Sequence, residues 1–160
     1  MDRHHHLCRE HALPALKPIG YWLNRTDKAL TRSMDSMLAE FGLTRIAWQV
    51  LNVIEDGPPG TGTDMPTVLT ALAANADAAT LTAAVEAVIA GGWAARPAPG
   101  RLVLTGDGRA RLSAVAGRVH AFRDLSTAGI SGEEYRITVT VLERMTRNLE
   151  SVWPGSMQHA

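Results

Sequence analysis

Apolar side chains recur every three or four residues over six stretches of this chain, and short runs rich in Gly, Pro, Asp and Ser separate them. This spacing gathers the apolar side chains on one face of a helix, so each stretch is predicted to be an amphipathic helix. Side chains that can cap a helix precede three of them, namely Thr44, Asp77 and Ser131. The predicted helices span residues 18–41, 45–55, 66–74, 78–90, 106–125 and 131–150.

A short hairpin is predicted between the fourth and fifth of these helices. Residues 93–96 and 101–105 have the character of strands, and Pro97-Ala98-Pro99-Gly100 supplies the turn between them. Residues 57–64, GPPGTGTD, are predicted to be loop because Gly and Pro end regular structure. The chain is therefore predicted to be mainly α with a small β-hairpin wing, folded as a winged helix-turn-helix.

The order of these elements, together with the segments GLTRIAWQVLNVI and LTGDGRARL, resembles the MarR family of bacterial transcription regulators. In that family a strand ending in Leu-Thr-x-x-Gly-Arg leads into a long dimerisation helix. The resemblance covers most of residues 18–150 and implies dimerisation helices at 18–41 and 106–151 around a winged domain at 42–105. It also implies a transcriptional regulator that binds double-stranded DNA and responds to a small-molecule ligand in a cleft between these two parts.

The apolar stripes independently indicate a homodimer. Helices 18–41, 106–125 and 131–150 each carry one, and a single small winged core cannot cover all three. They are expected to interlock with a second copy of the chain. Such an interface should exceed about 2,000 Å².

The predicted recognition helix, DAATLTAAVEAVIAGG, offers few groups suited to DNA, since its charged residues, Asp77 and Glu86, are both acidic. The wing is short and lacks the Asp-x-Arg element that wings of the MarR family normally carry. The chain has 16 basic and 16 acidic residues, so binding to phosphates must depend on a local set of side chains. The candidate DNA-binding residues are Thr80, Thr82 and Ala83 on the helix, Arg96 and Arg101 on the wing, and Arg45, Arg109 and Arg111 near helix ends.

The cleft that the resemblance implies has aromatic and polar candidates for ligand binding. They are Tyr21, Trp22, Asn24, Arg25, Trp48 and His120. The tryptophans could instead fill the core, and His120 could be a structural histidine rather than a ligand or a proton carrier. The sequence identifies neither the ligand nor a cofactor.

A second hypothesis is a winged-helix dimer that has lost DNA binding and uses the cleft for a ligand or cofactor, even as a biosynthetic enzyme. The chain has no Gly-rich dinucleotide fingerprint, no Ser-x-x-Lys and no His-Glu-x-x-His motif, so no catalytic residue is assigned. DNA binding at low salt distinguishes the two hypotheses.

The two ends of the chain are predicted to be tails, at residues 1–17 and 152–160. The first holds four histidines and Cys8, which could bind a metal ion, but a flexible tail is the simpler interpretation and no metal site is assigned. A single cysteine excludes an intrachain disulfide and fits a reducing compartment. No run is apolar enough for a signal peptide or a membrane span, so a cytoplasmic protein without a membrane partner is expected.

Overall fold

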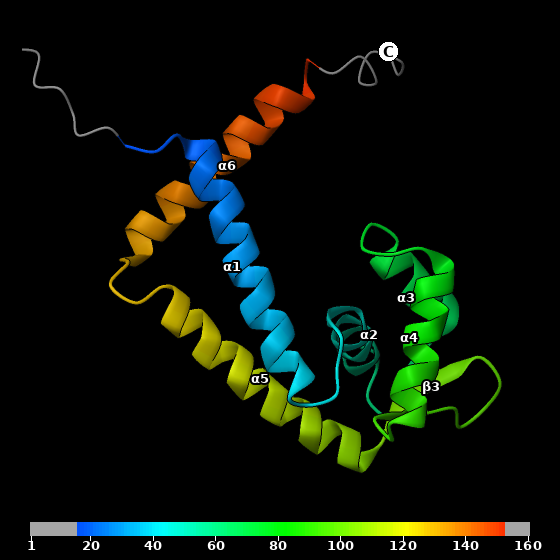
Figure 1. Ribbon diagram of the computed structural model, residues 1–160. Coiled ribbons are helices and arrows are strands. Elements are labelled where there is room, and N and C mark those ends of the chain that lie inside the picture. Colours follow the sequence, from blue (N-terminus) through cyan, green and yellow to red (C-terminus); the bar gives the residue numbers. More distant parts are fainter. Residues whose placement is uncertain (1–15, 153–160) are drawn as a thin grey trace, which may run out of the picture.

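The computed structural model describes residues 16–152, and in this part of the chain six helices and three short strands follow one another (Figure 1). The helices are α1 (Ile19–Ala39), α2 (Arg45–Glu55), α3 (Met65–Leu72), α4 (Ala78–Ala90), α5 (Gly106–Ser126) and α6 (Gly132–Glu150). The strands are β1 (Thr63–Asp64), β2 (Ala94–Ala95) and β3 (Arg101–Leu104). All six predicted helices are confirmed, with ends shifted by at most two residues. The histidines and Cys8 of the predicted first tail lie outside the described residues.

The first helix is shorter than the predicted 18–41 because a glycine ends it. Gly42 has a φ of 72°, a left-handed conformation that glycine adopts without steric cost. The Leu43 amide then donates to the Leu38 carbonyl at 3.0 Å, which is the closing bond of a Schellman motif. This turn redirects the chain into α2.

The core lies in the winged head, which is defined here as residues 42–105. Side chains from α2, α3, α4 and β3 are fully buried there, among them Val50, Val68, Val85 and Leu102. Two longer helices are anchored in the same cluster, α1 through Leu38 and α5 through its apolar stripe at Leu112, Val115 and Val119. The head is therefore a closed unit, and it exposes no large hydrophobic side chain.

The wing belongs to a three-stranded antiparallel sheet with the order β1-β3-β2. The prediction of a two-stranded hairpin was wrong in this respect, because Thr63 and Asp64 pair with Leu102 and Arg101. A two-residue strand leaves no periodic signal in a sequence. Gly62 makes the pairing possible, since a Cβ atom on it would lie 2.1 Å from the Leu102 carbonyl oxygen.

The helices α1, α5 and α6 form an open frame beside the head (Figure 1). This frame carries the large hydrophobic side chains that stay exposed in a single chain, and α6 has no buried residue at all. The exposed set on α1 is Ile19, Tyr21, Trp22, Leu23 and Leu30, and that on α6 is Tyr135, Ile137, Val139, Val141 and Leu149. No helix among residues 16–152 is long and apolar enough to cross a membrane.

The predicted caps are confirmed at the starts of α2, α4 and α6, where Thr44, Asp77 and Ser131 accept backbone amides. Glu134 completes a capping box with Ser131. At α4 the Thr80 amide donates to the Asp77 carboxylate at 2.7 Å and lowers the pKa of that carboxyl below its usual value.

An Asp77→Asn variant tests the charge at this cap. A carboxyl whose pKa is lowered by folding stabilises the native state above its unfolded pKa, and this contribution is lost as the pH falls through the folded pKa. Asparagine caps equally well without titrating. We expect thermal unfolding to give the wild type the higher Tm at neutral pH, with a difference that shrinks below about pH 4. A difference that stays constant with pH would contradict this explanation.

Candidate functional site

The outer face of α4 is the candidate DNA-reading face. The helix buries Leu81, Ala84, Val85 and Val88 against the head, and Thr80, Thr82, Ala83 and Glu86 on its other side are exposed. The predicted reading residues Thr80, Thr82 and Ala83 are all exposed. The Thr82 hydroxyl donates to the Ala78 carbonyl at 2.8 Å, so its oxygen is left to accept. The side chains on this face are therefore accessible to a partner, and they are small and uncharged except for Glu86.

The wing arginine next to this face is not free. The Arg96 guanidinium donates to the Glu86 carboxylate, and this ion pair joins the end of β2 to α4. The bond lowers the pKa of Glu86 below its usual value and raises that of Arg96. The two charges therefore cancel locally on the head.

Two more of the predicted DNA-binding arginines donate to backbone carbonyls of the head. Arg101 donates through Nε to the Thr61 carbonyl at 3.0 Å, which ties β3 to the loop before β1. Arg111 donates to the Gly91 carbonyl at 3.0 Å, and its guanidinium carbon lies 3.8 Å from the centre of the Trp93 ring. Both side chains brace the wing and the start of α5.

The last two candidates lie in different places. Arg109 is exposed on the first turn of α5, beside the wing. Arg45 begins α2 but reaches back to α1, where it donates to the Asp35 carboxylate at 3.2 Å and to the Thr31 carbonyl at 3.5 Å. Arg45 therefore links the head to the frame.

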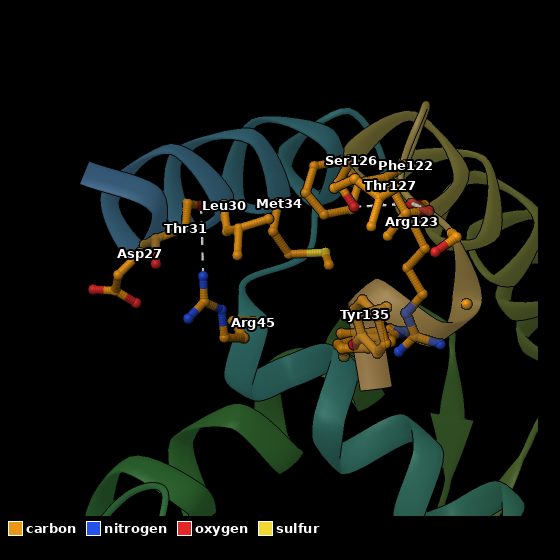
Figure 2. Close-up of a pocket in the computed structure, with 14 residues that line it drawn as sticks. Asp27, Leu30, Thr31, Met34, Arg45, Phe122, Arg123, Ser126, Thr127 and Tyr135 are labelled. Carbon is orange, nitrogen blue, oxygen red and sulfur yellow. Dashed lines mark hydrogen bonds between the residues drawn. The ribbon is translucent and has the colours of Figure 1, made fainter. Parts of the chain in front are cut away.

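A cavity of about 700 Å³ lies between the frame and the head (Figure 2). It is bounded by the middle of α1, the start of α2, the end of α5 and the start of α6. Its walls are Asp27, Leu30, Thr31, Met34, Arg45, Trp48, Phe122, Arg123, Ser126, Thr127, Ile130, Ser131, Gly132 and Tyr135. The volume suits an organic molecule of ordinary cofactor or metabolite size.

The chemistry of the walls is mixed. Leu30, Met34, Trp48 and Phe122 supply an apolar and aromatic surface, whereas Arg45 and Arg123 bring positive charges to the wall. The Ser126 and Thr127 hydroxyls both donate to the Arg123 carbonyl, at 2.8 and 2.9 Å, which fixes the turn after α5. The cavity can therefore take a molecule with an apolar body and a polar or anionic group.

Of the predicted ligand-binding residues, Trp48 lines this cavity. Trp22 and Arg25 line a neighbouring cavity of about 380 Å³ on the other side of Leu30, and Arg25 donates to the Tyr21 hydroxyl at 2.7 Å. Tyr21 and Asn24 line neither cavity. His120 also lies outside both, with its side chain 79% exposed and its Nε2 atom 3.6 Å from Asp124.

The sequence prediction missed most of the cavity walls. It took the first turns of α1 as the lining, whereas the cavity uses the turns at Leu30 and Met34. It also missed the segment from Phe122 to Tyr135, where α5 ends and α6 begins. The short gap between the helices predicted at residues 106–125 and 131–150 was the available signal, because a turn between two helices brings their ends together.

Residues 16–152 contain no group of three or more His, Cys, Asp or Glu side chains placed to hold a metal ion. Charged side chains in this range pair with one another instead, as Arg118 does with Glu40 at 2.9 Å between α5 and α1. The two candidate sites are therefore the outer face of α4 and the cavity.

Three helices, a short wing and a frame of long flanking helices define the winged-helix fold of the MarR type. No protein-family model matches the sequence, and no curated protein sequence matches it either. Solved structures do match, and they establish this fold.

Three of them illustrate the likeness. The MarR family protein Rv2887 of Mycobacterium tuberculosis, in complex with DNA, superposes with a TM-score of 0.63 at 22% identity, covering 81% of this chain and 98% of that one. The reduced form of MarR from E. coli gives 0.62 at 18% identity, covering 81% and 94%. The transcriptional repressor CouR, bound to p-coumaroyl-CoA, gives 0.65 at 22% identity, covering 81% and 92%.

Proposed function

We propose that the protein is a DNA-binding transcription regulator that acts as a homodimer and responds to a small molecule in the cavity. The observation that carries the proposal is the outer face of α4, which is exposed from Thr80 to Glu86 beside the wing. A MarR family protein with the same fold has been solved in complex with DNA, and this likeness supports the same use of the head here.

The frame supports the homodimer. A helix of 19 residues without one buried side chain, as α6 is, does not bury enough apolar surface to hold its place in a single chain. A second copy related by a two-fold axis would present the same exposed stripes of α1 and α6, and the apolar stripes of the two copies can cover each other. Two heads held in this way can contact two half-sites of one DNA duplex.

DNA binding is expected to be weak and only moderately sensitive to salt. Each neutralised phosphate contributes about 0.9 to the slope of log affinity against log salt, and a typical repressor has a slope near 10. Because several head arginines are bound to internal acceptors, we expect a slope of roughly 6 or less for the dimer. The measurement is fluorescence anisotropy of a labelled duplex from the region upstream of the protein's own gene, titrated at several salt concentrations.

Arg109→Ala is the test variant, because this exposed side chain lies beside the wing and has no hydrogen-bond acceptor among residues 16–152. We expect weaker binding to every DNA sequence alike. The slope of log affinity against log salt should be lower by about 1.8, because each of the two subunits loses one phosphate contact. Arg144→Ala, an exposed arginine of α6, is the control and should change neither. A slope near 10 would contradict the weak-binding description, and no binding even at low salt would favour a protein that uses only its cavity.

The cavity can be tested with an aromatic anion, 8-anilinonaphthalene-1-sulfonate, whose fluorescence rises in apolar surroundings. CouR was solved with an aromatic acyl-CoA, which supports an organic ligand for this chain as well. Arg123→Glu replaces one of the two arginine cations of the cavity wall by an anion, so we expect roughly tenfold weaker dye binding. Arg144→Glu, outside the cavity, should leave it unchanged. Equal dye affinity in both variants would argue against this site.

A further inference from the structure

The ion pair between Glu86 and Arg96 lies on the part of the head that is proposed to contact DNA. Glu86 belongs to the outer face of α4 and Arg96 to the wing, so the pair spans the two elements that a winged head brings to DNA. Both side chains are about half exposed, at 56% and 41%. Each side chain keeps an exposed part that solvent or a phosphate can reach.

Glu86 is the one carboxylate on the exposed part of α4 that is not used as a helix cap, since Asp77 accepts the Thr80 amide. An unpaired carboxylate at this position would repel the DNA backbone. Arg96 cancels that charge, and Glu86 in turn cancels the charge of Arg96. The pair as a whole therefore offers phosphates no net attraction.

We propose that Glu86 is a specificity-determining residue of the DNA-reading face, because it holds Arg96 and so limits affinity for DNA of arbitrary sequence. The inference rests on the proposed DNA-binding function. If Arg96 turned to a phosphate on such DNA, the gain would be offset by the Glu86 carboxylate left beside the same backbone. A base that donates to the carboxylate, as the N4 amino group of cytosine does, compensates Glu86 and leaves Arg96 to bind a phosphate.

Of the arginines near the wing, Arg96 is the one that a substitution of a carboxylate can release. Arg101 and Arg111 donate to backbone carbonyls within the head, at Thr61 and Gly91, and removing a carboxylate does not release them. Arg96 has a single acceptor among the hydrogen bonds of residues 16–152, and that acceptor is the side chain of Glu86. A change at Glu86 therefore releases one cation per subunit and no others.

The experiment compares the full-length wild type with Glu86→Gln, Arg96→Ala and the double variant. Two duplexes of equal length are used: one that the wild type selects from a random pool, and one with the same bases scrambled. Affinity is measured by fluorescence anisotropy over a series of salt concentrations. Glu143→Gln, which removes the carboxylate of the similar Glu143–Arg147 pair on α6, is the matched control.

For Glu86→Gln we expect roughly tenfold tighter binding to the scrambled duplex and a slope steeper by about 1.8, from one new phosphate contact in each subunit. The affinity ratio between selected and scrambled duplexes should fall. On the scrambled duplex the double variant should return to the wild-type slope, and Glu143→Gln should match the wild type on both duplexes. This set of results would establish the role of Glu86.

An unchanged slope and ratio in Glu86→Gln, with the wild type binding DNA, would overturn the inference and leave the proposed function standing. On the scrambled duplex, a slope lowered by about 1.8 in Arg96→Ala alone would also overturn it, because Arg96 would then already contact phosphate there in the presence of Glu86. Absence of wild-type binding to both duplexes at the lowest salt would overturn the proposed function itself, and this inference with it.

Discussion

Replacing Val139 by Asp is expected to make the protein monomeric at micromolar concentration. Val139 lies on α6 and is 46% exposed in a single chain, so the substitution would have little effect on a protein that is a monomer. In the proposed dimer it is buried in both copies. Losing the burial of two valines at about 1.5 kcal/mol each weakens the dimer by roughly 3 kcal/mol, which is about 100-fold or more in the dissociation constant.

The adjacent residue supplies the control for this experiment. Val139 shares a helical face with Tyr135 and Leu142, whereas Thr140 shares the opposite face with Arg136 and Arg147. Thr140→Asp therefore places the same new charge in a polar setting and should leave the dimer intact. Light scattering over a range of concentrations measures both variants. A Val139→Asp dimer as stable as the wild type would contradict this use of α6.

The fold was predictable because its signals are local. Helical spacing of apolar residues, with caps at Thr44, Asp77 and Ser131, located every helix to within two residues. The strand β1 was not predictable in the same way, since its two residues are defined only by pairing with β3, some 40 positions further along the chain.

The candidate sites were less predictable, because they depend on side-chain partners that are distant in sequence. Arg96 and Arg101 were correctly placed on the wing, but their acceptors at Glu86 and Thr61 are set by the packing of the wing against α4 and the loop before β1. The cavity likewise depends on the angle between α5 and α6, which no periodicity encodes. Composition and spacing thus identified the elements, while the interactions between them required the structure.

The start of α5 offers the sharpest test of how the wing is held. Gly108 is buried in the first turn of this helix, directly against the backbone of Trp93, and a Cβ atom added there would lie 1.9 Å from the Trp93 carbonyl oxygen. That oxygen cannot rotate away as a side chain could, and it also accepts the Thr105 amide at 3.0 Å. Gly108→Ala must therefore push α5 away from the wing.

We expect Gly108→Ala to destabilise the protein by roughly 3 kcal/mol, the upper part of the range for overpacked sites, and to lower the Tm by about 6–12 °C. Gly106→Ala, in the same turn, adds its methyl group to open space and should stay within about 0.5 kcal/mol of the wild type. Thermal unfolding of the three proteins at one concentration makes the comparison. Because α5 connects the head to the frame, Gly108→Ala should also weaken DNA binding at temperatures where the protein is still folded. Equal stability of the two alanine variants would show that α5 is free to move against the wing.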